Sequence, residues 1–295
     1  TILMSSAISH FLVDAVCVAA LFCHKSDSAF YNGVLLYNTL AFTGQAVTGL
    51  FADRSRDPLW LAVSGMLLCS LCAVLPLGIY VCAAGLGIGN NLFHVGGGCH
   101  VLRSSRDKAA PLGIFVAPGA LGVALGTWIP SAAPWFAAAS SVPAVLLLIA
   151  VKKETQPLQK PSQKAQAPTV LPVALLLASV AVRAIGGSAV SFSWKAGPQQ
   201  ALILAFFVFA GKFLGGFLCD RLGPAKTAWL SILPAAFLTA FFQSRMVLSL
   251  AGQWLLNLTM PVTLYLLARL LESRPAAAFG IAAAALWSGT LAGQL

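Results

Sequence analysis

The sequence predicts an all-α polytopic membrane protein built from two repeated halves, and three observations lead to this fold class. The chain has 295 residues, of which 59% are hydrophobic and only 9% are charged, against roughly 25% charged residues in a soluble domain. The apolar residues gather in runs of about 20, the length that crosses the hydrocarbon core as a helix. Features of the first half recur in the second at a constant offset. Together these observations exclude an ordinary soluble enzyme, a disordered chain and a nucleic-acid-binding module.

Eleven apolar stretches are long enough to be membrane spans. They lie at residues 3–23, 29–51, 59–76, 77–102, 112–129, 132–151, 169–193, 199–219, 228–243, 246–268 and 277–294. Most of the seven cysteines fall inside these runs, where a free cysteine acts as a small hydrophobic residue. We therefore expect no metal site and no cofactor.

The basic residues predict the orientation in the membrane. With the N-terminus in the cytoplasm, the inner loops carry Arg54, Arg56, Arg103, Arg106, Lys108, Lys152, Lys153, Lys160, Lys164, Arg221, Lys226, Arg269 and Arg274. The outer loops carry only Lys25, Lys195 and Arg245. This bias follows the positive-inside rule. It assigns the net charge of +10 to orientation in a cell (inner or plasma) membrane rather than to a nucleic-acid partner.

One polar segment, KKETQPLQKPSQKAQAP, divides the chain. Its Gln, Lys and Pro content is typical of a flexible linker. We therefore predict a six-helix half at 1–151, a cytoplasmic linker at 152–168 and a second half at 169–295 with five spans.

The two halves align without gaps at an offset of 167 residues. Gly44, Gly49, Asp53, Arg54, Gly85, Asn90, Gly113, Ile114, Ala117 and Gly122 coincide with Gly211, Gly216, Asp220, Arg221, Gly252, Asn257, Gly280, Ile281, Ala284 and Gly289. Repeated halves are typical of transporters. Because five spans face six, the repeat predicts a twelfth span after Leu295.

Two copies of one loop carry a family resemblance. Gly49-x-x-x-Asp53-Arg54 and Gly216-x-x-x-Asp220-Arg221 each follow the second span of a half. This doubled loop resembles the signature loop of the major facilitator superfamily, although the first copy departs from its pattern at Arg56. The resemblance implies transport by alternating access, with these residues forming a conformational latch. The alternative is a pair of charged caps that only stop a helix from sliding.

The resemblance also implies that the first and fourth spans of each half line the central cavity. Asp14 is the only acidic residue deep in a span, and His10 lies one turn earlier on the same face. We predict that Asp14, His10 and His94 couple transport to protons, since a buried carboxylate beside an imidazole, as in Asp14 and His10, can titrate near neutral pH. The alternative is an interhelical hydrogen-bond pair that fixes packing.

Other polar residues in the spans are candidates for contacting the solute. They are Asn90, Asn91, Arg183, Gln253 and Asn257. Arg183 needs an anion, either Asp14 or the solute, while the amides can equally serve as hydrogen bonds between helices. We expect Lys212 to extend toward the cytoplasm. Glycines at 96–98 and in Pro118-Gly119-x-x-Gly122-x-x-x-Gly126 allow close approach of another backbone or a ligand.

These residues predict a secondary transporter of a small organic solute. Segments Ser9–Asp14 and Asn91–His94 also resemble fosmidomycin-resistance exporters, which favours proton-coupled export of a drug or organic anion. Proton-coupled uptake of a small metabolite is the alternative. A non-transporting receptor or an intramembrane enzyme is an alternative of another class, and an enzyme would need clustered acids that the spans lack. We expect a monomer whose partners are solute, protons and lipid.

Overall fold

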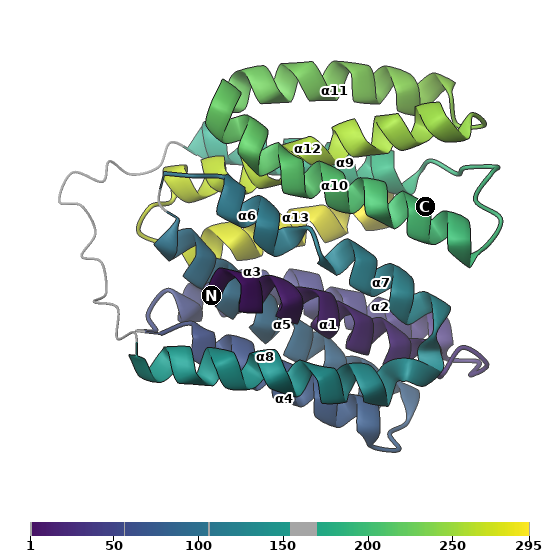
Figure 1. Ribbon diagram of the computed structural model, residues 1–295, viewed down its shortest axis with the longest axis vertical. Coiled ribbons are helices and arrows are strands. Elements are labelled where there is room, and N and C mark those ends of the chain that lie inside the picture. The colour runs from purple at the N-terminus through teal and green to yellow at the C-terminus, as the bar shows by residue number, and fades with distance from the viewer. Residues whose placement is uncertain (1, 56, 106, 154–169, 295) are drawn as a thin grey trace.

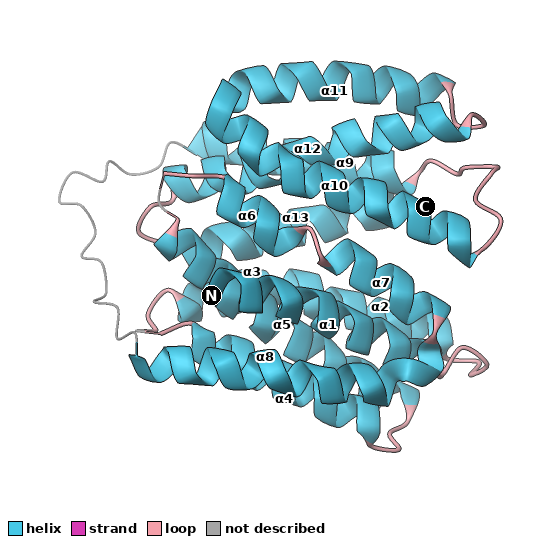
Figure 2. Cartoon of the chain, viewed as in Figure 1, coloured by secondary structure: helices cyan, strands magenta, loops and turns pink. Residues whose placement is uncertain are grey.

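The computed structural model describes residues 2–55, 57–105, 107–153 and 170–294. Within these residues every regular element is a helix (Figure 2). The predicted linker lies outside the described residues except for its first two, which end a helix. Arg56, Arg106, Lys160 and Lys164 of the predicted inner set also lie outside them.

The helices follow one another through short connections. The first half contains α1 (Ile2–Phe22), α2 (Phe30–Asn38), the π-turn η1 (Thr39–Thr43), α3 (Gly44–Ala52), α4 (Leu59–Val74), α5 (Ile79–Ser104), α6 (Ala110–Val116), α7 (Gly119–Trp128), the 3₁₀ turn η2 (Pro130–Ala132) and α8 (Ala133–Lys153). The second half contains α9 (Val170–Ser188), α10 (Pro198–Leu222), α11 (Pro224–Phe241), α12 (Met246–Leu270) and α13 (Pro275–Ala292).

These helices correspond to the eleven predicted spans. α2, η1 and α3 are consecutive and form one span, and α6 and α7 form another that is interrupted at Ala117-Pro118, because proline lacks the N–H that a continuous helix requires. Eight of the described spans are long and apolar enough to cross a membrane, and α4 is a shorter apolar helix. The seventh span ends at Ser188, earlier than predicted, in the glycine-rich stretch that follows Arg183.

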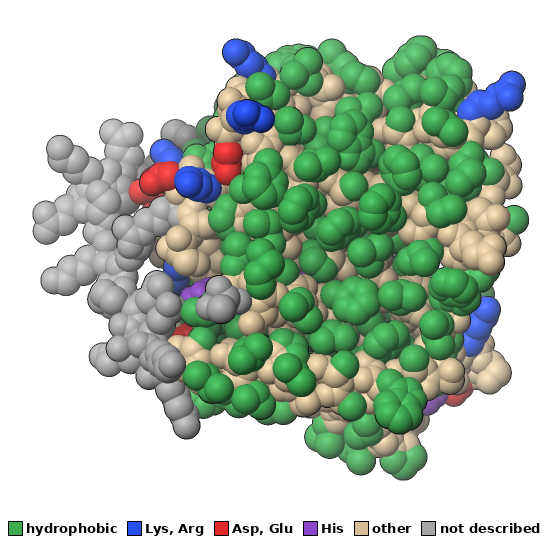
Figure 3. All heavy atoms as spheres, in the orientation of Figure 1, with side chains coloured by type: hydrophobic (Ala, Val, Ile, Leu, Met, Phe, Trp, Pro, Cys, Tyr) green, Lys and Arg blue, Asp and Glu red, His purple; other side chains and the backbone are tan. Residues whose placement is uncertain are grey.

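The helices run side by side, so the molecule has two ends (Figure 1). We call the end at which α8 finishes and α9 begins the linker end; the turn after α3 and the start of α13 also lie there. Charged side chains on the visible face gather at the two ends, with a broad hydrophobic belt between them (Figure 3). That distribution is expected of a bundle surrounded by lipid. The all-α membrane fold predicted from the sequence is therefore confirmed.

Glycines bring several helices into close contact. Gly122 faces the backbone of Phe11, and Gly126 faces the backbone of Ala15, so α7 packs directly on α1. This small-residue packing is what the glycine spacing predicts.

The three consecutive glycines of α5 serve packing as well. Gly96 meets the backbone of α4 at Ala62, while Gly97 and Gly98 meet the rings of Phe115 and Phe279. α5 stays helical throughout this stretch. The run therefore admits a backbone and two aromatic rings.

Candidate functional site

Two helices of the first half bring four polar side chains together. α1 supplies His10 and Asp14, and α5 supplies Asn90 and His94. His10 Nε2 lies 2.9 Å from His94 Nε2 and 3.3 Å from Asp14 Oδ2. Asn90 Nδ2 donates to Asp14 Oδ1 at 3.0 Å, and His94 Nε2 lies 3.9 Å from the same oxygen. The three residues predicted to carry protons, His10, Asp14 and His94, thus lie together with Asn90. We call these four residues the Asp14 cluster.

The contacts of His94 assign its tautomer. Its Nδ1 lies 2.9 Å from the carbonyl oxygen of Asn90, which can only accept a hydrogen bond. Nδ1 of the neutral ring therefore carries the hydrogen, and Nε2 has a free lone pair directed at His10. A proton on His10 Nε2 can then be shared with His94 or with Asp14. The cluster can hold a proton and move it between three groups.

Apolar groups and one glycine enclose the Asp14 cluster. The rings of Phe93 and Phe115 lie 5.9 and 5.0 Å from the His10 ring, measured between centroids. Gly119, the first residue of α7, lies against both members of the α1 pair, because a Cβ there would be 2.5 Å from His10 Nε2 and would also overlap Asp14 Oδ2. Low polarity strengthens the electrostatic interactions inside the cluster.

Three ligand atoms of His10, Asp14 and His94 lie within 4.8 Å of one another, a spacing that a metal ion also accepts. A metal-bound histidine almost always donates its second ring N–H to a neighbouring acceptor. His94 does so, but the buried Nδ1 of His10 has no hydrogen-bond partner among the described residues. The arrangement therefore fits a proton better than a metal.

The second half contributes two cations near the centre. Arg183 of α9 donates to the hydroxyl of Thr259 on α12 at 3.1 Å, and it forms no ion pair with an acid in the part of the chain that the structure describes. Lys212 of α10 lies within electrostatic range of Asp14, His94 and Arg183. Its location differs from the expected extension toward the cytoplasm. Sequence reasoning underestimated Lys212 because one helix alone does not show which neighbours its side chain meets.

The remaining predicted residues do not join the Asp14 cluster. Asn91 donates to the carbonyl of Leu40 in η1 at 3.3 Å. Asn257 donates at 2.9 Å to the carbonyl of Gln253, one turn earlier in α12. The buried Nε2 of Gln253 has no hydrogen-bond partner among the described residues. A solute contact by these three amides stays a prediction.

At the linker end, each half caps a helix of the other half. Asp53 accepts hydrogen bonds from the backbone N–H groups of Ala276 and Ala277, at 2.8 and 2.9 Å, at the start of α13. Asp220 accepts from Ala109 and Ala110, at 2.6 and 3.0 Å, at the start of α6. A carboxylate at a helix N-terminus is electrostatically favourable, because the N-terminus carries a partial positive charge. We call these contacts the Asp53 latch and the Asp220 latch.

Backbone contacts at the same places bring the halves close together. A Cβ on Gly49 would collide with the backbone of Ala276, and one on Gly216 with the backbone of Ala109. Each residue of the Asp53 latch, and its glycine, has a counterpart in the Asp220 latch at a distance of 167 positions along the chain. The repeat found in the sequence is thus a repeat of the contacts that join the halves.

The Asp53 latch has an additional support. Arg103 of α5 donates to the backbone carbonyls of Ser55 and Asp53, at 3.0 and 3.3 Å. Burial raises the pKa of the Asp53 carboxyl, while the two amide donors and the guanidinium of Arg103 act in the opposite direction. Arg54 and Arg221, the basic members of the doubled loop, are exposed.

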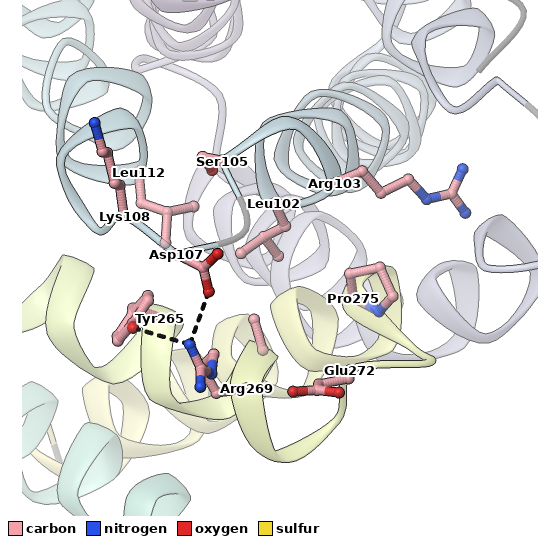
Figure 4. A pocket seen from close by; sticks show the side chains of 11 residues that line it. Leu102, Arg103, Ser105, Asp107, Lys108, Leu112, Tyr265, Arg269, Glu272 and Pro275 are labelled. Carbon is pink, nitrogen blue, oxygen red and sulfur yellow. Dashed lines mark hydrogen bonds and ion pairs between the residues drawn. The ribbon is translucent and has the colours of Figure 1, made fainter. Parts of the chain in front are cut away.

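A polar pocket of about 270 Å³ opens between the halves at this end (Figure 4). Arg269 of α12 pairs with Asp107 at 3.0 Å and contacts the hydroxyl of Tyr265 at 3.4 Å. The pair joins the two halves, but it is exposed to solvent and contributes little.

Comparison with known proteins places this arrangement in a fold family. In sequence the chain matches no family profile and no curated protein. Its structure matches that of a major facilitator superfamily transporter, FucP in the outward conformation, with a TM-score of 0.64 and 12% identity over 98% of this chain and 89% of that one. The human organic anion transporter MFSD10 matches with a TM-score of 0.69 and 14% identity over 99% and 91%. The chain has the major facilitator fold. A second structure of FucP, the Escherichia coli fucose:proton symporter, matches with a TM-score of 0.62 and 13% identity over 98% and 89%.

Proposed function

We propose that the chain is a secondary transporter that moves a small organic solute by alternating access and couples this movement to protons at the Asp14 cluster. The observation that carries the proposal is the hydrogen-bonded set of one carboxylate and two imidazoles inside a major facilitator fold. An ionisable residue within a membrane span is costly and is a functional candidate by default. The Asp14 cluster is the site at which we place proton binding.

The two latches support the alternating-access part of the proposal. Both are formed at the linker end, and each joins one half to the other. At the opposite end, an open groove of about 740 Å³ separates α7 from α10. The halves are therefore joined by hydrogen bonds at the linker end, while the larger groove lies at the opposite end. With the N-terminus in the cytoplasm, as the basic residues favour, the open end faces outward.

Other features of the proposal follow the sequence. The six-helix half, the linker, the second half and a monomer in the cell membrane belong to it as predicted. Export and uptake are the two possible directions of such a carrier. A receptor would not need a proton-binding cluster. For an intramembrane enzyme we expect several clustered acids, whereas Asp14 is the one acid of this cluster.

The test is proton flux in proteoliposomes that contain the full chain, with a panel of organic anions and drugs added. We expect solute-dependent proton flux in the wild type and a loss of at least about 100-fold in Asp14→Asn, since a positioned proton-transfer group contributes 10²–10⁴-fold. Asp107→Asn is the matched control, because Asp107 is an exposed acid at the linker end. Solute transport that survives Asp14→Asn with proton movement intact would contradict the proposal.

A further inference from the structure

The two cations of the second half lack anionic partners of their own. Lys212 forms no hydrogen bond or ion pair in the described ranges, and Arg183 is bonded only to a neutral hydroxyl. A charge inside a membrane protein is stabilised by pairing. An anionic group bound at Lys212 would give this cation a partner of its own.

The groove between α7 and α10 leads toward Lys212. Its α10 wall consists of Ala201, Leu204, Ala205 and Val208, which recur at helical spacing on one face. The next position of that stripe is Lys212, one turn or about 5.4 Å farther into the bundle. The α7 wall is also mostly apolar, with Val123, Ala124 and Trp128. The apolar α10 wall of the groove therefore lies on the helix face that carries Lys212 one turn farther along.

We propose that the solute is an amphipathic organic anion whose acid group binds Lys212 while its apolar body lies in the α7–α10 groove, and that this anion binds together with a proton on Asp14. The proposal rests on the transporter function above and names its substrate class and the sense of its coupling. The combination of a charged end and an apolar wall selects such a molecule over a sugar or an inorganic ion.

The joint binding follows from the charges that surround Asp14. His10 faces it from α1, and Asn90 and His94 face it from α5. Tyr37 of α2, Cys69 of α4 and Lys212 of α10 are within electrostatic range of it, and α7 presents only Gly119. Lys212 is thus the lysine whose positive charge acts on Asp14, although it forms no ion pair with the carboxylate in the described residues.

An anion on Lys212 offsets this positive charge and repels the carboxylate of Asp14. A proton on Asp14 removes the repulsion and frees Lys212 for the anion. By linkage each ligand increases the affinity for the other by the same factor. A proton and an anion that favour one another bind to the same state of the carrier and move in the same direction. This coupling favours the uptake symporter over the export that the sequence suggested.

The experiment measures binding of 2-naphthoate to the full chain in nanodiscs at pH 6 and pH 8. The carboxylate of this probe stays ionised at both values. In the wild type we expect its affinity to be about tenfold higher at pH 6 than at pH 8, with proton uptake on binding, within the usual range of coupling factors. The neutral 2-naphthamide should bind at least about tenfold more weakly, the factor that separates a charge-assisted contact from a neutral one.

Variants separate the parts of the proposal. Lys212→Gln should lose about tenfold in affinity at pH 6, Lys212→Arg should retain binding, and Asp14→Asn should bind the probe equally at both pH values. Lys226→Gln is the control, because Lys226 is an exposed lysine of α11 that does not line the groove, and it should change affinity less than about twofold. Absence of binding by the wild type, unchanged binding in Lys212→Gln, or affinity that rises with pH would each overturn the proposal.

Because this experiment measures binding, its failure is distinct from failure of the transporter proposal. Proton-coupled flux of another solute with no naphthoate binding would retain the transporter and reject the anion class. Lys212-dependent binding without any flux in proteoliposomes would retain the anion site and reject transport.

Discussion

The two halves of the molecule share their latches but not their centres. At the linker end, Asp53 and Asp220 cap helices of the opposite half with the same pair of backbone hydrogen bonds. In the centre, the first half places Asp14 where the repeat has Ala181, and the second half places Lys212 where the repeat has Gln45. The carboxylate is held by neighbours at 3.0 and 3.3 Å, whereas the ammonium has no such bonds within the described residues.

This difference separates two roles of an internal repeat. In the proposed mechanism, rocking two halves about a central site requires equivalent contacts on both sides, which the latches of the repeat would supply. The proposed binding of a proton and an anion requires opposite charges in the centre, and two identical halves could not supply them. The acid on one side and the cations on the other are therefore the part in which the halves had to diverge.

We expect the largest effect from a substitution that fills the space beside the Asp14 cluster. Gly119→Ala places a methyl group against His10 and Asp14, and only the paired groups themselves could move to admit it. We expect proton-coupled flux to fall by at least about 100-fold, the contribution of a positioned proton-transfer group. The measurement is flux in proteoliposomes at equal protein content.

Gly186→Ala is the matched control in the second half. A Cβ at Gly186 meets nothing within 4 Å, and glycine in a helix is less stable than alanine by about 0.8–1.0 kcal/mol. This variant should retain flux and show equal or slightly higher thermal stability. Equal flux in the two variants would contradict this prediction, because proton transfer would then not depend on the positions of His10 and Asp14.

The latches offer a test of equivalence between the halves. Asp53→Ala or Asp220→Ala removes two hydrogen bonds to a carboxylate, and bonds to charged groups contribute about 1.5–3 kcal/mol each when buried. Because both sites are partly exposed, we expect about 1.4 kcal/mol for each latch, or a roughly tenfold shift toward opening of the linker end. The double variant should shift it roughly 100-fold, since the latches share no residue.

Distances between the halves would report this opening. Nitroxide labels at the exposed positions Arg54 and Glu272 lie on opposite halves at the linker end, and Cys23→Ser removes the exposed native thiol. Each single variant should add a population with a longer distance, and the double variant should make it dominant. An effect confined to one of the two aspartates would show that the repeated contacts do not act equally.

Much of the fold follows from local properties of the sequence. Apolar runs long enough to span a membrane predict the helices, and the offset of 167 predicts which loops are equivalent. The kind of group that each aspartate contacts also follows from elementary electrostatics, because a carboxylate stabilises the N-terminus of a nearby helix. Which helix supplied that N-terminus depended on the packing of the two halves and could not be predicted.

The centre was predictable only in part for the same reason. His10 and Asp14 lie four residues apart on one helix, so their contact follows from helical geometry. The approach of His94, and the position of Gly119 against the pair, depend on how α5 and α7 pack on α1. Lys212 was underestimated because its significance lies in the charges of other helices, which no spacing within α10 reveals.

We expect the smallest effect from substitutions of two asparagines, Asn90 and Asn257, that occupy equivalent positions in the repeat. Asn90 donates to the carboxylate of Asp14, whereas Asn257 donates to a backbone carbonyl of its own helix. Asn90→Ala removes a hydrogen bond to a charged group. We expect the interaction free energy that holds the carboxylate to fall by about 1.5 kcal/mol. Because that bond holds the carboxylate of Asp14, its loss should change the pH dependence of flux. Asn257→Ala should leave the pH profile in place and change only the apparent KM, and a shift of the same size in both variants would show that the amide of Asn90 supports packing instead of positioning Asp14.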